Sequence, residues 1–211
     1  MSSSLIAGKQ VIFIIMGRKN IFFIIIFSNL LIFSCEKIHY RVVECPQKTR
    51  EATIIFAQKY IDKENEFLLG GRDYLEKEGI LQLDCSGFIV RVYEYAVKGT
   101  KYSLLFDDAP LSAIYQYFNI PIEQEMLTPG DLIFMGNPPA ISAHISESES
   151  FTSSIVFPPT HLSLFVRMDD ENIYFMDATF IEEMEIDGVS IRFYPKDDSR
   201  FMSYGRMLVR Y

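Results

Sequence analysis

The sequence predicts an α+β fold in which helices come first and an antiparallel sheet follows. Up to about residue 118, apolar residues recur at the spacing of helical turns. After residue 128 they form short runs separated by turn residues, which is typical of strands. Hydrophobic residues make up 49% of the 211 residues, so the chain can bury a core of ordinary size in a single domain.

Three helices are expected in the first half of the chain. Their ranges are Arg50–Ile61, Cys85–Val97, and a third from Asp107 or Asp108 to Phe118. Gly70 and Gly71 break the chain between the first two helices. The second helix has a clear apolar stripe, formed by Phe88, Ile89, Val92 and Ala96. In the third, an aspartate is expected as the N-cap and Pro110 in the first turn, where proline is favoured.

The second half begins with a turn at residues 128–131, Thr-Pro-Gly-Asp. Five short strands are expected after it, at Leu132–Met135, Leu162–Val166, Ile173–Met176, Val189–Phe193 and Met207–Tyr211. Between the first two of these strands lies the segment Asn137–Pro159, which is rich in Ser, Glu and Pro and too long for an ordinary connection. We expect this segment to be a functional lid or a disordered insertion.

The N-terminal residues have the pattern of an export signal. Residues 17–20 include two basic residues, and residues 21–33 are almost entirely apolar. This apolar run is shorter than the roughly 20 residues that cross a bilayer as a helix. It ends in Leu-Ile-Phe-Ser-Cys at 31–35, which resembles the lipobox of bacterial lipoproteins. The resemblance implies that Cys35 is acylated and becomes the mature N-terminus; an uncleaved N-terminal anchor helix is the alternative.

The expected organisation therefore has three parts. Residues 1–35 form the signal and lipobox segment, with Met16 as the expected true start. The polar residues 36–48 form a short tether, and residues 49–211 form the folded domain. We expect this domain outside the cytoplasmic membrane, at the bacterial cell envelope, because the N-terminal segment has the pattern of an export signal. Two or three acyl chains on Cys35 would anchor it there stably.

The charge and the cysteine content exclude several classes of function. The formal net charge is −8 and the isoelectric point is near 4.9, so the chain has no basic stripe that would bind a nucleic acid. The cysteines at positions 35, 45 and 85 are too few and too scattered for a disulfide framework or a zinc site. We expect no metal and no cofactor.

Cys85 is the candidate nucleophile. It stands at the start of the second predicted helix, within Leu-Asp-Cys-Ser-Gly-Phe at 83–88. The dipole and the unpaired N–H groups of a first helical turn favour the thiolate form of a cysteine. They can also donate to the oxyanion that forms when a thiolate attacks a carbonyl. Gly87 is expected to leave room for a substrate backbone beside the sulfur. A buried, unreactive cysteine is the alternative interpretation.

A thiolate nucleophile needs a base, and the sequence contains three histidines. His39 lies in the tether and His144 in the long polar segment, whereas His161 begins a predicted strand that would hold its imidazole in place. We therefore expect His161 to be the base, with His144 as the alternative. Asp177 ends the next predicted strand, and we expect it to orient the imidazole of His161.

The order of these motifs resembles the NlpC family of cell-wall cysteine peptidases. The resemblance rests on Gly70-Gly71, Asp-Cys-Ser-Gly-Phe at 84–88, Pro-Gly-Asp-Leu at 129–132, His-Leu-Ser-Leu at 161–164 and Asp177-Ala178. It extends from about Arg50 to Tyr211. It implies a papain-like fold, with the nucleophile helix packed on a five- or six-stranded antiparallel sheet. Cys85 would then be the nucleophile, His161 the base and Asp177 the third polar residue.

The resemblance also implies a substrate. The family hydrolyses amide bonds in peptidoglycan stem peptides, usually between D-glutamate and the following diamino acid. Residues that flank the nucleophile help to hold the free amino end of the stem peptide, which implies a binding role for Asp84 and Ser86.

Several departures from the family pattern keep other functions open. Family members usually carry Tyr and Trp before the paired glycines, whereas this chain has Phe67-Leu68-Leu69. The segments before Asp84 and before His161 are also longer than typical. A papain-like amidase or acyltransferase with another substrate is therefore an alternative. A non-catalytic surface lipoprotein that binds wall peptides is another, although it would not need both Cys85 and His161.

Overall fold

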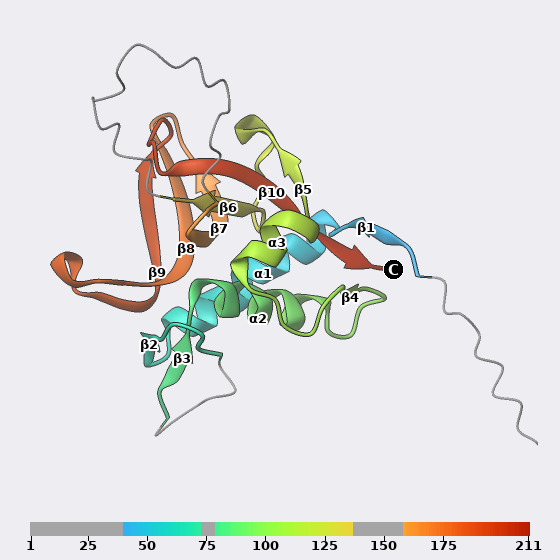
Figure 1. Ribbon diagram of the computed structural model, residues 1–211, viewed down its shortest axis with the longest axis horizontal. Helices are drawn as coiled ribbons and strands as arrows, with labels where there is room; N and C mark the ends of the chain where they lie inside the picture. The colour runs from blue at the N-terminus through green and yellow to red at the C-terminus, as the bar shows by residue number, and fades with distance from the viewer. Residues whose placement is uncertain (1–39, 73–78, 137–157) are drawn as a thin grey trace, which may run out of the picture. The chain divides into compact units, whose positions relative to one another are not determined.

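The computed structural model describes residues 40–72, 79–136 and 158–211. They belong to one compact unit, Tyr40–Tyr211, which combines helices with a large antiparallel sheet (Figure 1). The α+β class predicted from the sequence is therefore confirmed. The helices are α1 (Gln47–Ile61), α2 (Cys85–Val97) and α3 (Leu111–Tyr117), with the 3-10 turns η2 (Gln124–Met126) and η3 (Glu182–Met184).

The main sheet has eight strands, and all of their pairings are antiparallel. In spatial order its main path is β1 (Val42–Glu44), β10 (Phe201–Arg210), β6 (Leu132–Met135), β7 (His161–Met168), β8 (Asn172–Ile181) and β9 (Ile186–Pro195). Two further strands, β4 (Ser103–Leu104) and β5 (Asn119–Ile122), also pair with β10. The five predicted strands are present as β6 to β10. The additional strands have four residues or fewer, too short for an alternating pattern to identify them.

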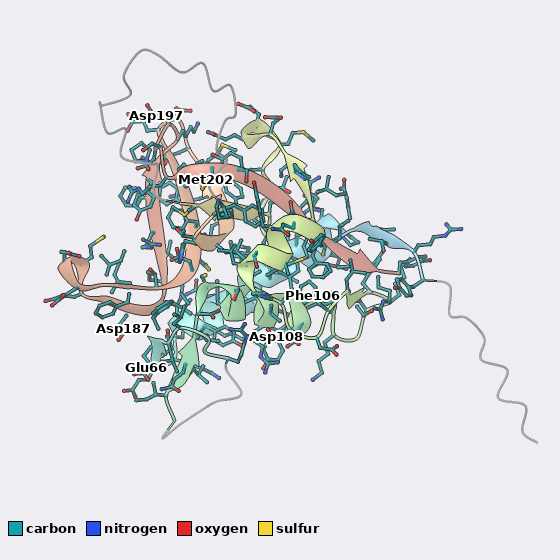
Figure 2. All side chains as sticks on the ribbon, in the orientation of Figure 1. Glu66, Phe106, Asp108, Asp187, Asp197 and Met202 are labelled. Atoms are coloured by element: carbon teal, nitrogen blue, oxygen red, sulfur yellow. The ribbon has the colours of Figure 1, made fainter. Side chains whose placement is uncertain are left out.

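A second, two-stranded sheet sets the position of α2. Its parallel strands are β2 (Asn65–Phe67) and β3 (Leu81–Leu83), and β3 ends two residues before Cys85. Two hydrogen bonds tie β2 to β9. The Asn65 side-chain oxygen accepts from the Val189 N–H at 2.5 Å, and the Phe67 N–H donates to Asp187 at 2.6 Å. Figure 2 shows the labelled Glu66 of β2 near Asp187 at this end of the domain. The start of α2 is thereby connected to the main sheet.

Helix α2 has the bounds that were predicted for it, Cys85–Val97. Asp84 is its N-cap, with extended backbone angles and a side chain that accepts from the Gly87 N–H. Its predicted apolar stripe is buried, and the helix packs against α1 and against β7 and β8. The sheet strands supply Leu162, Leu164 and Met176 to the same core.

A smaller apolar cluster lies apart from the core around α2. Its buried members are Leu127, Ile133, Met135, Phe165, Ile173 and Phe175. In β6 and β7 these residues alternate with those of the main core, because successive side chains of a strand point to opposite faces. The central strands are therefore covered on both faces. This explains why all four residues of β6 are apolar and buried.

The folded unit begins earlier in the chain than the sequence indicated. Residues 42–48, assigned to the tether, contain β1 and the start of α1. The Arg41 N–H donates to the Tyr211 carbonyl at 3.0 Å, and β1 pairs with β10. This pairing uses backbone groups, which the polar side chains of the segment do not reveal. Residues 1–39, including Cys35, lie outside the described residues. In the part described, no helix is both long and apolar enough to cross a membrane.

The start of α3 also differs from the prediction. The helix begins at Leu111, and its N-cap position is held by Pro110, without a capping hydrogen bond from a side chain. Asp108, one of the two predicted caps and labelled in Figure 2, instead accepts a hydrogen bond whose donor is the Arg72 Nε, at 2.9 Å. An ion pair with this buried arginine satisfies the carboxylate in place of a helix N-terminus.

The turn at 128–131 is held by a buried cluster of charges. Asp131 is fully buried and forms ion pairs with Arg50 of α1 at 2.9 Å and with Arg206 of β10 at 3.0 Å. It also accepts from the backbone N–H of Thr128 at 2.8 Å. Gly130 has a φ of +89°, and a Cβ there would meet the Arg50 carbonyl oxygen at 2.1 Å. The Pro-Gly-Asp motif therefore joins α1 to the centre of the sheet.

Asp131→Ala is expected to lower the free energy of unfolding by about 3–5 kcal/mol, because it leaves two arginines at a buried site without their shared carboxylate. Urea denaturation measures the change. Glu94→Ala, which removes the partly exposed Arg91–Glu94 pair on α2, is the control and should cost about 0–1 kcal/mol. Equal losses in the two variants would contradict a structural role for the cluster.

Candidate active site

Cys85 is the first residue of α2, as the sequence predicts, and it is partly exposed. Its helix start is fixed by Asp84, which accepts from the Gly87 N–H at 2.6 Å and whose carbonyl accepts from the Phe88 N–H at 2.9 Å. The N–H groups of a first helical turn have no acceptor within the helix, so this end of α2 favours negative charge near the sulfur.

His161 approaches Cys85 from the sheet. It is the first residue of β7, and its side chain is 21% exposed. Its Nε2 lies 2.6 Å from an oxygen of Asp177, which leaves Nδ1 as the ring nitrogen that can face Cys85. Burial lowers the pKa of His161, but hydrogen bonds to Asp177 and Cys85 and the charges of these two groups outweigh it. Together they raise the pKa from 6.5 to about 9.

Asp177 completes the predicted group of three residues. It lies inside β8 rather than at its end, because β8 continues to Ile181. Its side chain is fully buried, which by itself raises the pKa of the carboxyl, yet the pKa is lowered overall by hydrogen bonding to His161 and by the charges of His161 and Arg192. The carboxylate is therefore ionised beside the imidazole. The structure brings Cys85, His161 and Asp177 together, from α2, β7 and β8.

Two further partners of Asp177 were not predicted from the sequence. The Ser163 hydroxyl donates to Asp177 at 3.0 Å. Arg192 of β9 donates to Asp177 through Nε at 3.0 Å and also through Nη2, so that the contact with the carboxylate is bidentate. Arg192 is buried although its neighbours Ile191 and Phe193 are exposed. Because successive side chains of a strand point to opposite faces, a charged residue at a position that faces the core is the sequence pattern that could have identified Arg192.

Asp84 and Ser86, predicted to bind substrate, are buried and bonded within the chain. One oxygen of Asp84 accepts from the Ser86 hydroxyl at 2.8 Å and from Arg72 at 2.9 Å, in addition to Gly87. The other oxygen accepts from the Gly70 N–H at 2.9 Å. Asp84 therefore joins the paired glycines to the start of α2, and its charge is offset by Arg72.

Gly87 has a different role from the predicted one. A Cβ at this position would meet the Gly71 carbonyl oxygen at 2.4 Å and the Arg72 Nη1 at 2.8 Å. The space beside Gly87 is thus filled by the chain's own loop, not left open for a substrate. Gly87 is required because the loop at 70–72 crosses directly over the first turn of α2, whereas a Cβ at Gly71 would meet the carbonyl oxygens of Leu68 and Gln82 at 2.7 and 2.8 Å.

Arg72 is a third residue that sequence reasoning missed. It is 8% exposed, and its guanidinium donates to the Gly71 carbonyl at 2.7 Å and pairs with Asp84 and Asp108. These bonds tie the loop at the nucleophile to the segment before α3. The only indication in the sequence was its place directly after the paired glycines.

Other sequence-based candidates lie outside the described residues. His39, His144 and most of the segment Asn137–Pro159 belong to this group, so the alternative base remains a prediction. Cys45, in contrast, is described: it is fully buried, and burial raises the pKa of its thiol to about 12. In residues 40–72, 79–136 and 158–211, no cluster of three or more His, Cys, Asp or Glu side chains could hold a metal ion.

No protein-family profile matches the chain, and no curated protein matches its sequence. Among solved structures, it is similar to a crystal structure from Staphylococcus aureus subsp. aureus Mu50, described as similar to a lipoprotein of the NLP/P60 family. The identity is 20% and the TM-score 0.44; the similarity covers 78% of this chain and 43% of that one.

Iodoacetamide at pH 7 is expected to alkylate Cys85 at least tenfold faster in the native chain than Cys45, because Cys45 is buried and its thiol stays protonated. His161→Gln should slow the alkylation of Cys85 by tenfold or more, since it removes the cation that pairs with the thiolate. Peptide mass mapping measures both rates. Unchanged alkylation of Cys85 in His161→Gln would contradict the pairing.

Proposed function

We propose that this chain is a cysteine hydrolase that cleaves amide bonds in peptidoglycan stem peptides, with Cys85 as nucleophile, His161 as base and Asp177 as the orienting carboxylate. The observation that carries the proposal is the pairing of His161 with the buried Asp177 beside a cysteine at a helix start. A binding protein has no need of an ionised carboxylate that holds an imidazole against a thiol.

The first half of the proposed reaction is acyl transfer to Cys85. The thiolate attacks the carbonyl carbon of the substrate amide, and the oxygen becomes an oxyanion that accepts from N–H groups at the start of α2 that Asp84 does not engage. The C–N bond then breaks, and the imidazolium of His161 gives its proton to the departing amine. The acyl group is left on the sulfur as a thioester.

The second half releases the acid. A water molecule gives a proton to the neutral imidazole of His161 and attacks the thioester carbon. The C–S bond breaks, a carboxylic acid leaves, and the thiolate–imidazolium pair forms again. Asp177 keeps the imidazole oriented through its hydrogen bond with Nε2. Nδ1 therefore donates the proton in the first half of the reaction and accepts it in the second.

The choice of substrate rests on the motifs that resemble the NlpC family. The bond proposed to be cleaved joins D-glutamate to the following diamino acid. The proposed fold is papain-like, with the helix that carries Cys85 packed on the sheet that carries His161. Lipid attached to Cys35 would hold the domain at the cell envelope, close to the peptidoglycan.

A different amide substrate is the second candidate, and two observations favour it. Phe67 stands where the family usually has a tyrosine, so a hydroxyl is lost next to the paired glycines. The carboxylate of Asp84, which the family resemblance assigns to the free amino end of the peptide, is already paired with Arg72. An amidase or acyltransferase would use the same three catalytic residues.

The native chain is expected to release new fragments from purified peptidoglycan, whose masses identify the bond that is cut. Cys85→Ala should reduce release at least 10³-fold without unfolding the domain, because it removes the nucleophile. Arg91→Ala, at the partly exposed pair with Glu94 on the same helix, is the matched control and should keep most of the activity. Fragments released equally by Cys85→Ala would contradict the proposal, and a native chain that releases none would favour the second candidate.

Hydrolysis is expected to decline above about pH 9, by about tenfold per pH unit, because His161 with a pKa of about 9 then loses the proton that the departing amine needs. Alkylation of Cys85 should not decline over the same range, since a rising pH does not return a proton to a thiol. Rates measured from pH 6 to pH 10.5 test this. A hydrolysis rate that stays constant to pH 10.5 would contradict the proposed role of His161.

Stability must be checked over the same range of pH. Because the pKa of His161 in the folded chain lies above 6.5, its pairing stabilises the fold fully below pH 6.5. That contribution is lost as the pH rises through about 9. Circular dichroism at each pH therefore separates unfolding from loss of the imidazolium proton.

A further inference from the structure

We propose that Arg192 is a positioning residue that balances the charge of Asp177, so that the two side chains orient His161 as a net neutral pair. This inference rests on the proposed function, since it concerns how the same site is tuned. It differs from a simple Cys-His-Asp arrangement, in which a lone carboxylate would face the imidazole.

The contact between Arg192 and Asp177 has the geometry of a two-point ion pair. The Nε of Arg192 donates to one oxygen of Asp177 at 3.0 Å, and Nη2 donates to the other. The oxygen that receives Nη2 is also the one that lies 2.6 Å from His161. Arginine and imidazole therefore share one carboxylate, and the position of that oxygen depends on both of them.

Burial makes this pairing strong. Asp177 is fully buried, and the side chain of Arg192 is 6% exposed. Interactions between charges are weakly screened at such a site, so the guanidinium offsets the field of the carboxylate at His161. The third partner of Asp177 is the neutral hydroxyl of Ser163, which adds no charge.

The sheet fixes Arg192 in place. Asp177 faces Ser190 across the β8–β9 pair, and Arg192 lies two residues further along β9, opposite Phe175. Its guanidinium lies 5.1 Å from the centre of the Phe175 ring, and its Nη1 donates to the Tyr194 hydroxyl at 2.7 Å. With its nitrogens engaged on both sides, the guanidinium has little freedom to leave the carboxylate.

Few charges surround the imidazole in the part of the chain described. His161 faces Cys85 from α2 and Asp177 from β8, and Arg192 from β9 lies behind Asp177. With Cys85 removed, the Asp177–Arg192 pair is thus the local source of charge at His161. The proposal can therefore be tested with a double-mutant cycle that removes the charge of Arg192, of Asp177, or of both.

The test is an NMR titration of His161 in the full chain carrying Cys85→Ala, which needs neither substrate nor activity. The histidine signals are assigned with His161→Gln, since the sequence has three histidines. Three variants complete the cycle in this background: Arg192→Met, Asp177→Asn, and the double variant.

Arg192→Met should raise the pKa of His161 by about one unit or more, because a lone carboxylate then faces the imidazole. Asp177→Asn should lower it by about as much, since a lone guanidinium remains. The double variant should return to within about half a unit of the parent, as should Arg192→Lys, which keeps the positive charge.

The control for a nonspecific loss of a buried arginine is Arg206→Met, because Arg206 pairs with Asp131 and Glu44 instead of with the site. It should leave the pKa of His161 unchanged. If Arg192→Met does not fold, the comparison of Asp177→Asn with the double variant gives the same answer, since neither contains an unpaired buried carboxylate.

A pKa of His161 that stays within about 0.3 units in all folded variants would overturn the proposal and leave Arg192 with a packing role. The same holds if Arg192→Lys shifts the pKa as far as Arg192→Met. The proposed function can fail separately: in that case peptidoglycan yields no fragments, although the pKa of His161 follows the cycle.

Discussion

The structure around the site depends on the pairing of a carboxylate that has no contact with solvent. A buried charge without partners costs several kcal/mol, and Asp177 is fully buried. It is satisfied by His161 from β7, Ser163 from the same strand and Arg192 from β9. Three neighbouring strands therefore need one another's side chains at a single point. The imidazole is oriented as a result of this requirement, because it supplies one of the bonds that make the buried charge stable.

Cys85, the proposed nucleophile, stands at a helix start that is held by a second buried carboxylate. Asp84 is buried, caps α2 and forms an ion pair with Arg72. Arg72 also forms an ion pair with Asp108. The two halves of the site thus have a similar construction, in which an arginine offsets a buried aspartate next to a reactive side chain. A third buried aspartate, Asp131, pairs with arginines from α1 and β10 and joins the helices to the sheet away from the site. The chain is acidic overall, yet its buried aspartates are paired with arginines.

The sequence predicted the elements whose patterns are local. The apolar stripe of α2 and the short apolar runs of β7 and β8, separated by turn residues, identified them, and Cys85, His161 and Asp177 were proposed from their places on these elements. Arg72 and Arg192 were missed because their roles depend on partners 12 and 15 residues away that only the folded chain brings close. The pairing of β1 with β10 was missed for a similar reason, since it uses backbone groups. The role of Gly87 was misjudged because the residues that fill its space, Gly71 and Arg72, lie 16 and 15 residues earlier in the chain.

The central claim is that Cys85 forms a covalent intermediate with a substrate acyl group while His161 serves it. The most direct measurement is mass spectrometry of the intact chain, quenched with acid milliseconds after mixing with soluble peptidoglycan fragments. The account predicts a transient increase in mass that equals the acyl half of the cleaved peptide, located on the peptide that contains Cys85 and absent from Cys85→Ala. Cleavage of the fragments with no adduct on Cys85 at any time, or with equal speed in Cys85→Ala, would contradict it.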